Sequence, residues 1–301
     1  MTQTDSYDPE SAPHTVVTGH IADVSHHLPT EIARCVITSP PYFGHRTYSE
    51  GDERELGRED SVDEYVERLV KMLGQVRDQL YEDGTLWLNL GDTYRNKQLL
   101  GIPWRVALRM KDDGWILRSD IIWHKPNAMP SSVTSRPTVD HEYLFLFSKA
   151  DSYQYNADAI REPHVTFSSA SKMKGGRNHF GKRDGTPEAG KNAGNNNLHD
   201  ARWDQAFHPL GRNRRTVWSV PLGKFRGAHF AVFPERLVEP CILAGSSEGD
   251  LVMDPFAGSG TVGVVAKRLN RRFLGVELVP EYATIARQRV DQTAQGLPGF
   301  T

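Results

Sequence analysis

The sequence predicts an α/β fold, built on a mostly parallel sheet of seven strands with helices on both faces. Two observations support this prediction. Seven short apolar segments alternate with segments of helical periodicity, which is the pattern of strand–helix–strand units. Between the two halves of this pattern, residues 161–217 lack periodicity and are rich in glycine and asparagine, so we expect an inserted region there.

The first half of the chain contains five predicted strands and two predicted helices. The strands are the apolar runs at residues 16–19, 34–38, 85–90, 115–123 and 142–147. In the helices apolar residues recur every three to four positions, and the helices cover residues 62–84 and 103–113. A capping box at Ser61 and Glu64 marks the start of the first helix. No clear helix separates the last two strands, so we expect them to form an antiparallel hairpin.

The second half resumes with a helix from about residue 231 to 244. The predicted strands and helices that follow are residues 251–254, 260–269, 272–276 and 280–290, in the order strand, helix, strand, helix. The predicted organisation is then a disordered arm, a first half, an irregular region and a second half. Their boundaries are 1–14, 15–160, 161–217 and 218–301.

The composition is typical of a globular protein, with 38% apolar and 25% charged residues. No apolar run approaches the roughly 20 residues that span a bilayer, and the polar start of the chain lacks the apolar stretch of a secretory signal. The two cysteines are too few for a disulfide framework or a cysteine-rich zinc site, and the twelve histidines show no metal-ligand spacing. We therefore expect a cytoplasmic protein that contacts no membrane and holds no metal.

The charge of the chain is unevenly distributed. The net charge is −2, yet residues 171–215 contain ten Lys or Arg against four Asp or Glu, a local charge of +6 that leaves −8 for the remainder. Such segregation is typical of a basic docking surface for nucleic acid on an acidic body. A solvated, mobile loop would have the same charge, and the charge alone does not separate the two interpretations.

Two motifs follow predicted strands and carry the chemistry. The first is Thr38-Ser39-Pro40-Pro41-Tyr42, a rigid segment with an aromatic end. The second is Asp254-Pro255-Phe256-Ala257-Gly258-Ser259-Gly260, a glycine turn between a strand and a helix. Its glycines allow close approach of a ligand to the backbone, and the helix N-terminus favours a carboxylate. Glu277 ends the next strand, where a carboxylate can accept hydrogen bonds from both hydroxyls of a ribose.

A dinucleotide site is the alternative for the glycine turn. The spacing here is F-x-G-x-G, whereas dinucleotide folds use G-x-G-x-x-G. A P-loop is excluded more firmly, because no Lys-Ser or Lys-Thr pair follows the glycines.

In this order, the two motifs resemble those of the amino-methyltransferases of DNA, in the beta arrangement of that family. The resemblance implies a circularly permuted class I methyltransferase fold with S-adenosylmethionine as cofactor. It assigns the (S/D/N)-P-P-(Y/F) motif, Ser39 to Tyr42, to a target base. It assigns the F-x-G-x-G motif and its flanks to the cofactor, namely Thr38, Asp254, Phe256, Ala257, Gly258, Ser259, Gly260 and Glu277.

Two shorter segments extend the resemblance. The H-x-A-x-F-P segment upstream of the glycine turn implies that Phe233 and Pro234 wall the cofactor pocket, while packing at the start of a helix would also explain Phe233. Asp92 lies in a segment similar to G-D-(S/T)-Y, which implies a contact with the cofactor or with Ser39; a helix N-cap is the equal alternative. The family often has Gly-Asp where this chain has Gly19-His20, so no contact is inferred there.

The irregular region occupies the position of the family's target-recognition region. The resemblance therefore implies that it contacts double-stranded DNA through its basic side chains, for which we select Arg177, Lys182, Arg183, Arg212, Arg214 and Arg215. It also implies a prokaryotic or phage protein, with a cognate restriction endonuclease as a possible partner.

Methylation of an exocyclic amine requires that hydrogen-bond acceptors hold the amine protons and that an aromatic face holds the ring. Ser39, the fixed carbonyls of the Pro-Pro segment and the Tyr42 ring are suited to these tasks. The base must leave the duplex to reach them. No covalent nucleophile is needed, and Cys241, although in a Pro-Cys dipeptide, lies in an apolar helical pattern and is predicted to be a buried core residue.

The identity of the base is open to two interpretations. Both cytosine and adenine present an amine beside a ring nitrogen, so the chemistry of Ser39 suits either. Within the family, Ser-Pro-Pro-Tyr preceded by Thr is commoner in cytosine-N4 enzymes, which makes the N4 amine of cytosine the expected target and the N6 amine of adenine the alternative. A non-catalytic nucleic-acid-binding protein on the same fold is a further alternative.

Overall fold

The structure is a computed structural model of the 301-residue chain. The residues that it describes are 12–44, 54–163, 208, 210–223 and 233–296. The chain divides into two compact units, one formed by residues 1–156 and 216–301, the other by residues 157–215. Most of the predicted arm at 1–14 lies outside the described residues, and His14 already belongs to the first strand.

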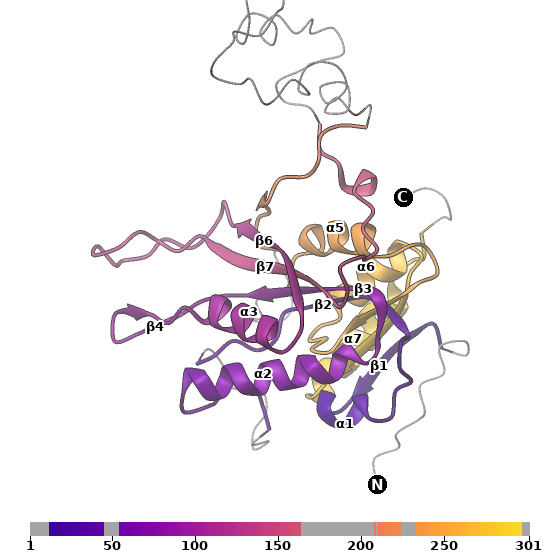
Figure 1. The fold of residues 1–301 in the computed structure, drawn as a ribbon, viewed down its shortest axis with the longest axis horizontal. Helices are drawn as coiled ribbons and strands as arrows, with labels where there is room; N and C mark the ends of the chain where they lie inside the picture. The colour runs from indigo at the N-terminus through magenta and orange to yellow at the C-terminus, as the bar shows by residue number, and fades with distance from the viewer. Residues whose placement is uncertain (1–11, 45–53, 164–207, 209, 224–232, 297–301) are drawn as a thin grey trace, which may run out of the picture. The chain divides into compact units, whose positions relative to one another are not determined.

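The first unit is organised around one sheet, to which eight strands of the described residues belong (Figure 1). From one edge to the other, the strands are β1 (His14–Thr18), β10 (Arg272–Glu277), β9 (Leu251–Asp254), β2 (Ala33–Thr38), β3 (Leu80–Leu90), β7 (His141–Ser148), β6 (Ile116–His124) and β8 (Val217–Ser219). Neighbours run parallel except for β3–β7 and β6–β7. The mostly parallel sheet and the antiparallel hairpin are therefore confirmed.

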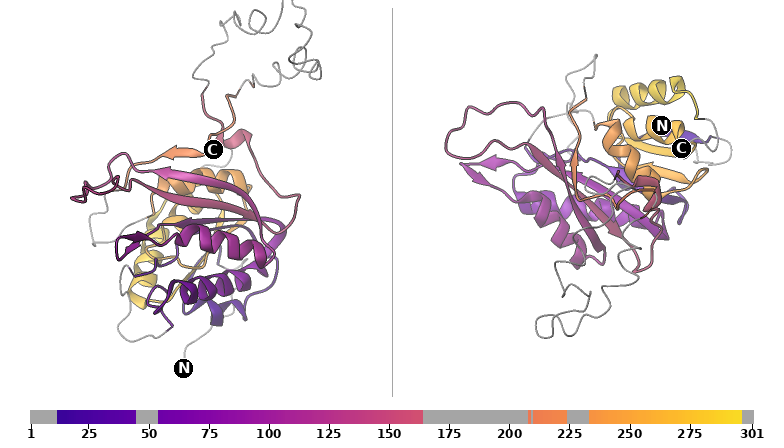
Figure 2. Two further views of the ribbon diagram at one scale, coloured as in Figure 1. Left: turned by 60° about the vertical axis from the view of Figure 1, so that its left-hand side comes forward. Right: turned by 90° about the horizontal axis from the view of Figure 1, so that it is seen from above.

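The helices lie on both faces of this sheet, as the sequence predicts. They are α1 (Ile21–Ser25), α2 (Val62–Arg77), α3 (Ile102–Asp112), α5 (Glu235–Gly245), α6 (Thr261–Arg268) and α7 (Pro280–Gln292). Figures 1 and 2 show the first three on one side of the sheet and the last three on the other. Alternation along β2 explains this, because Val36 packs in the cluster that contains α2 while the neighbouring Cys35 contacts Cys241 of α5.

Three boundaries differ from the sequence prediction. The helix predicted for 62–84 ends at Arg77, and strand β3 begins at Leu80, not at residue 85. Leu80 lies four residues after Val76, so it fits helical spacing, but it pairs with Ala33 of β2 and is fully buried there. Helix α5 begins at Glu235, after Pro234 with extended backbone.

In the described residues the main sheet has one strand more than the seven predicted, and two further strands, β4 (Tyr94–Arg95) and β5 (Gln98–Leu99), pair separately with each other. The eighth strand, β8, is three residues long and pairs with β6 in parallel. Only its central residue, Trp218, is buried, so the segment has too little apolar alternation to be recognised in the sequence. None of the helices in the described ranges is long and apolar enough to cross a membrane.

The described part of the second unit is small. It contains the single-turn helix η1 (Asp158–Ile160) and an antiparallel bridge between Glu162 and Arg212. The two side chains of this bridge also form an ion pair, with Arg212 Nε 3.0 Å from Glu162 Oε1.

Candidate active site at the carboxyl ends of the strands

The two motifs meet because their strands are neighbours. Strand β2 leads into the Ser39-Pro-Pro-Tyr42 segment, and β9 leads into the glycine turn; the strands pair in parallel through Cys35–Val252 and Val36–Met253. Their carboxyl ends therefore lie at the same edge of the sheet. The two halves of the chain also meet between β2 and β9, which is where open α/β sheets bind ligands.

A buried hydrogen bond joins the two motifs directly. Thr38 Oγ1 donates to Asp254 Oδ1 at 2.7 Å, and both residues are almost completely buried. The same carboxylate oxygen accepts the backbone N–H of Phe256 at 3.0 Å. Burial raises the pKa of Asp254 to about 7, because the charged form loses its hydration.

The glycine turn has a backbone that only glycine adopts readily. Gly258 and Gly260 have φ angles of +52° and +79°. A Cβ on Gly260 would lie 2.9 Å from the Cα of Ala286 in α7, so the turn packs tightly against that helix. Above Gly258 there is open space, since a Cβ there would have its nearest neighbour at 4.0 Å. Helix α6 begins at Thr261 without a side-chain cap.

Glu277 fastens the glycine turn to the end of β10. Its Oε2 accepts the Gly258 N–H at 2.7 Å, and its Oε1 accepts the Val279 N–H at 2.9 Å. Glu277 is 8% exposed, and burial raises its pKa. The sequence indicated a ribose acceptor at this position; it did not indicate the bonds to the turn. Two backbone bonds leave further lone pairs on the carboxylate for a ligand.

Three other segments of the chain pack against the Ser39-Pro-Pro-Tyr42 motif. The hydroxyl of Tyr65 in α2 donates to the carbonyl of Pro41 at 2.9 Å. Gly57 has a φ of +99°, and a Cβ there would lie 2.7 Å from the carbonyl oxygen of Tyr42. Gly91, at the end of β3, makes room for the Tyr42 ring, because a Cβ there would lie 2.7 Å from Cε2 of the ring.

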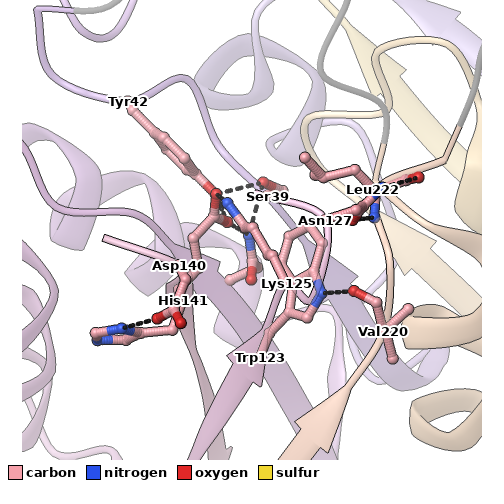
Figure 3. A network of polar contacts seen from close by, with 11 residues as sticks. Ser39, Tyr42, Trp123, Lys125, Asn127, Asp140, His141, Val220 and Leu222 are labelled. Carbon is pink, nitrogen blue, oxygen red and sulfur yellow. Dashed lines mark hydrogen bonds and ion pairs between the residues drawn. The ribbon is translucent and has the colours of Figure 1, made fainter. Parts of the chain in front are cut away.

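A network of polar side chains surrounds Ser39 and Tyr42 (Figure 3). The Tyr42 hydroxyl donates to Glu142 Oε2 at 2.6 Å and lies 3.2 Å from Ser39 Oγ. Asn89 Nδ2 lies 2.5 Å from the Tyr42 hydroxyl and 2.7 Å from Glu142 Oε2. Lys125 forms an ion pair with Glu142 Oε1. The network thus joins the end of β2 to β3, to the end of β6 and to β7.

The comparison with known proteins identifies the family. A family model described as DNA methylase, for N6 and N4 methyltransferases, matches residues 33–288. The chain is also 39% identical over 305 residues to the type II methyltransferase M.Cfr9I of Citrobacter freundii, which covers 92% of this chain and 87% of that protein. The chain belongs to the DNA methylase family.

Two solved structures resemble this methylase. The first is TTHA0409 of Thermus thermophilus, a putative DNA modification methylase in complex with S-adenosyl-L-methionine. It is 26% identical with a TM-score of 0.60, over 95% of this chain and 96% of that chain. The second is the cytosine-N4-specific PvuII DNA methyltransferase, 22% identical with a TM-score of 0.66, over 92% of this chain and 86% of that chain. These likenesses agree with the predicted class I methyltransferase fold.

Asp92 of the methylase holds the start of helix α3. Its Oδ2 accepts the Gly101 N–H at 3.0 Å, while its Oδ1 accepts the N–H groups of Ile102 at 3.2 Å and Thr93 at 2.9 Å. The N-cap residue of α3 is Gly101 and not Asp92, yet the Asp92 carboxylate accepts backbone N–H groups at the start of that helix. A contact of Asp92 with the cofactor stays a prediction.

The position of His20 has a similar explanation. Its Nδ1 accepts the N–H of Ala22 at 3.2 Å, and His20 is the N-cap of α1. The preceding Gly19 donates its N–H to the backbone carbonyl of Glu277 at 2.8 Å. This chain thus uses the Gly-His segment to connect β1, α1 and the end of β10.

Of the other predicted site residues, the structure describes some and leaves others outside the described residues. Pro234 is buried and Phe233 half-buried directly before α5, and Phe256 packs against the core cluster. Arg177, Lys182 and Arg183 lie outside the described residues, as do the other positions in 164–207. In the second unit, Arg212 and Arg215 both approach Glu162.

Cys241 is a buried core residue, as predicted. It is 0% exposed, and its Sγ donates to the Leu237 carbonyl at 3.2 Å within α5. The residues of this network that the sequence analysis did not identify are Asn89, Lys125 and Glu142. The sequence does show polar residues within or beside apolar strands at these positions. Burial of a polar side chain costs free energy unless it forms a hydrogen bond, so such residues indicate a buried polar contact.

Proposed function

We propose that this methylase transfers the methyl group of S-adenosylmethionine to the exocyclic N4 amine of cytosine in duplex DNA. The observation that carries the proposal is the Thr38–Asp254 hydrogen bond, because it holds the base motif and the cofactor motif side by side. A methyl donor on one motif is then adjacent to a methyl acceptor on the other, as direct in-line transfer requires.

S-adenosylmethionine is the cofactor of this methylase. The open space above Gly258 and the uncapped N-terminus of α6 fit its carboxylate end. Glu277 would accept hydrogen bonds from its ribose, while the cofactor contacts of Asp92, Phe233, Pro234 and Phe256 remain part of the proposal. When bound, the cofactor would supply an electrophilic methyl carbon to the amine nitrogen. The carbon–sulfur bond would break with its electron pair left on sulfur, and one amine proton would leave to solvent.

The base motif would hold a base that has left the duplex. The ring of Tyr42 offers a stacking face, and Ser39 offers a hydroxyl for the amine edge. The Pro40 and Pro41 rings fix the backbone between the two. These contacts stabilise the base only after it has flipped out, which adds the cost of unstacking to binding.

The choice of cytosine rests on Ser39. The Ser39 hydroxyl can accept a hydrogen bond from the amine. In the family that the motifs resemble, adenine-N6 enzymes usually have Asp at this position. The PvuII DNA methyltransferase, which is cytosine-N4-specific and shares the fold of this chain, supports the same choice. Adenine N6 is the alternative.

Duplex DNA would be contacted by the basic region, including Arg177, Lys182, Arg183, Arg212, Arg214 and Arg215. M.Cfr9I of Citrobacter freundii is a type II methyltransferase, and this likeness supports a cytoplasmic role in a prokaryote or its phage. It also supports a restriction endonuclease as partner.

The test is a methylation assay with labelled cofactor and duplex DNA, followed by mass spectrometry of the nucleosides. Label in N4-methylcytosine that disappears in Ser39→Ala supports the proposal. Label in methyladenosine alone overturns the choice of base. An absence of label in any nucleoside, from a folded protein that binds the cofactor, overturns the catalytic function and favours the non-catalytic alternative.

A further inference from the structure

A mostly buried ion pair between Lys125 and Glu142 lies next to Tyr42 of the Ser39-Pro-Pro-Tyr42 motif. The proposed reaction assigns no role to this pair. The side chains of Lys125 and Glu142 are only 16% and 14% exposed. Removing two charges from water is costly, so such a pair needs further hydrogen bonds to be tolerated. Glu142 receives them from the hydroxyl of Tyr42 and the amide of Asn89.

The loop that carries Lys125 is itself held in place. The backbone N–H of Lys125 donates to the carbonyl of Asp140 at 2.7 Å, and the Lys125 ammonium lies 4.7 Å from the ring centroid of Trp123. Two residues further on, the Asn127 side chain accepts the backbone N–H of Leu222 at 2.8 Å. The position of the ammonium is therefore fixed by β6, β7 and the segment after β8.

The carboxylate fixes the direction of the hydrogen bonds. An ionised Glu142 can only accept, so the 2.6 Å bond uses the single proton of the Tyr42 hydroxyl. Burial and the charge of Glu142 hold the pKa of Tyr42 well above its usual value, so the hydroxyl keeps that proton at neutral pH. In the 3.2 Å contact between Ser39 and Tyr42, Ser39 must then be the donor.

Asn89 is oriented by the same carboxylate. Its Nδ2 lies 2.7 Å from Glu142 Oε2, 2.5 Å from the Tyr42 hydroxyl and 3.3 Å from Ser39 Oγ. Only the amide nitrogen can face an acceptor-only carboxylate, which settles the orientation of the side chain. Ser39 thus has two polar neighbours in this network. The Tyr42 hydroxyl oxygen accepts its proton, and the Asn89 amide can donate to its oxygen.

We infer that Glu142 is a positioning residue for the methyl-acceptor amine, acting through Tyr42. The relay from Ser39 through Tyr42 to Glu142 directs the Ser39 proton away from the base. The Ser39 oxygen then offers a lone pair to an amine proton, beside the lone pair that the Asn89 amide can occupy. The inference rests on the proposed function, and it gives Tyr42 a second task. Stacking needs only the ring, whereas the relay needs the hydroxyl.

The experiment compares Tyr42→Phe, Glu142→Gln and the double variant under single-turnover conditions. We expect each single substitution to lower the rate of transfer about ten- to hundredfold, the range for a lost hydrogen bond to a charged group. Cofactor affinity by calorimetry should stay unchanged. The double variant should be no slower than the slower single variant, because both substitutions break one relay.

Matched controls exist at the opposite end of the sheet. Glu82 also pairs with a lysine, Lys149, at 3.5 Å, so Glu82→Gln is the counterpart of Glu142→Gln. Tyr81→Phe removes a tyrosine hydroxyl from the same strand as Asn89. Both should leave the rate unchanged.

The outcomes separate this inference from the proposed function. If the unsubstituted protein methylates DNA and Tyr42→Phe is equally fast, the relay is refuted while the function stands. Effects of Tyr42→Phe and Glu142→Gln that multiply in the double variant would also refute it. If Glu142→Gln does not fold, Tyr42→Phe alone decides. An unsubstituted protein that transfers no methyl group refutes the proposed function first.

Discussion

Thr38 and Asp254 stand 216 positions apart in the chain, and their side chains share a buried hydrogen bond of 2.7 Å. Each is the last residue of its strand, β2 or β9. The bond therefore fixes the distance between the segments proposed to hold the base and the cofactor. Because the acceptor is a carboxylate with a raised pKa, the bond also links this junction to pH.

The stability of the protein should depend on pH through Asp254. Its pKa in the folded state is raised from 3.8 to about 7, so the folded state binds a proton that the unfolded state has released. The stability associated with this group is complete below pH 4 and is lost as pH rises to about 7, by up to about 1.4 kcal/mol per pH unit. Asp254→Asn should lack this contribution.

Urea unfolding of both proteins from pH 4.5 to 8 measures it. The variant should gain stability relative to the unsubstituted protein as pH rises, since all other groups cancel in the difference. Parallel stability curves would contradict the buried, raised-pKa description of Asp254.

Glu277→Ala should weaken cofactor binding by about tenfold or more, the consequence of losing a hydrogen bond to a charged group. Part of the loss would come from the turn, because the Gly258 N–H loses its acceptor. Calorimetry with S-adenosylmethionine measures the affinity. Glu281→Ala, an exposed acidic residue in the first turn of α7, is the control. Equal affinities would remove Glu277 from the cofactor site.

Gly260→Ala should destabilise the fold more than Gly249→Ala. Both glycines have positive φ angles, +79° and +83°, so both substitutions introduce left-handed strain. Only at Gly260 would the new Cβ also meet backbone, at 2.9 Å, whereas Gly249 faces open space. The difference in unfolding free energy between the variants should be about 1–3 kcal/mol. A difference near zero would mean that α7 shifts freely away from the turn.

Cys241→Ala should leave methylation largely intact. The thiol is fully buried and donates within its own helix, so it cannot reach a base as a nucleophile. Electrophoresis under denaturing conditions checks for a covalent enzyme–DNA adduct. An adduct that forms in the unsubstituted protein and is lost in Cys241→Ala would rule out direct transfer.

Replacing Arg212, Arg214 and Arg215 together with Gln should flatten the salt dependence of DNA binding. Each phosphate contact contributes about 0.9 to the log–log slope, so three contacts would account for up to about 2.7. Titrations at several salt concentrations give the slope, with Arg105→Gln, an exposed arginine of α3, as control. An unchanged slope would leave the region as a solvated loop, without a role in DNA affinity.

The sequence predicted those features that depend on contiguous residues. Alternation and helical spacing located seven strands of the main sheet and the helices of the first unit other than the short α1. The two motifs located the edge of the sheet that we propose as the active site. The helix end at Arg77 was misplaced because Leu80 fits both spacings, and only its pairing with Ala33 decides between them. Strand β8 was missed because three residues contain too little pattern.

The sequence predicted the parts of the candidate site that lie within one contiguous segment, and it did not predict contacts between residues that are far apart in the chain. Tyr42 and Glu142 are 100 residues apart and meet because β3 and β7 are antiparallel neighbours. A glutamate at the start of a strand is ordinarily exposed, and nothing near Glu142 in sequence indicates Lys125 as its partner. The bond from Gly258 to Glu277 was hidden for the same reason, since it depends on how two strand ends converge.

The position of β1 at the edge of the sheet has a consequence during protein synthesis. Its residues pair with Phe273 to Glu277, which lie in the last tenth of the chain. Strand β1 is therefore translated well before β10, its hydrogen-bonding partner in the sheet. Until then its edge and the apolar side chain of Val16 face water, where other chains can pair with them. Docking of β1 therefore has to wait for the translation of β10.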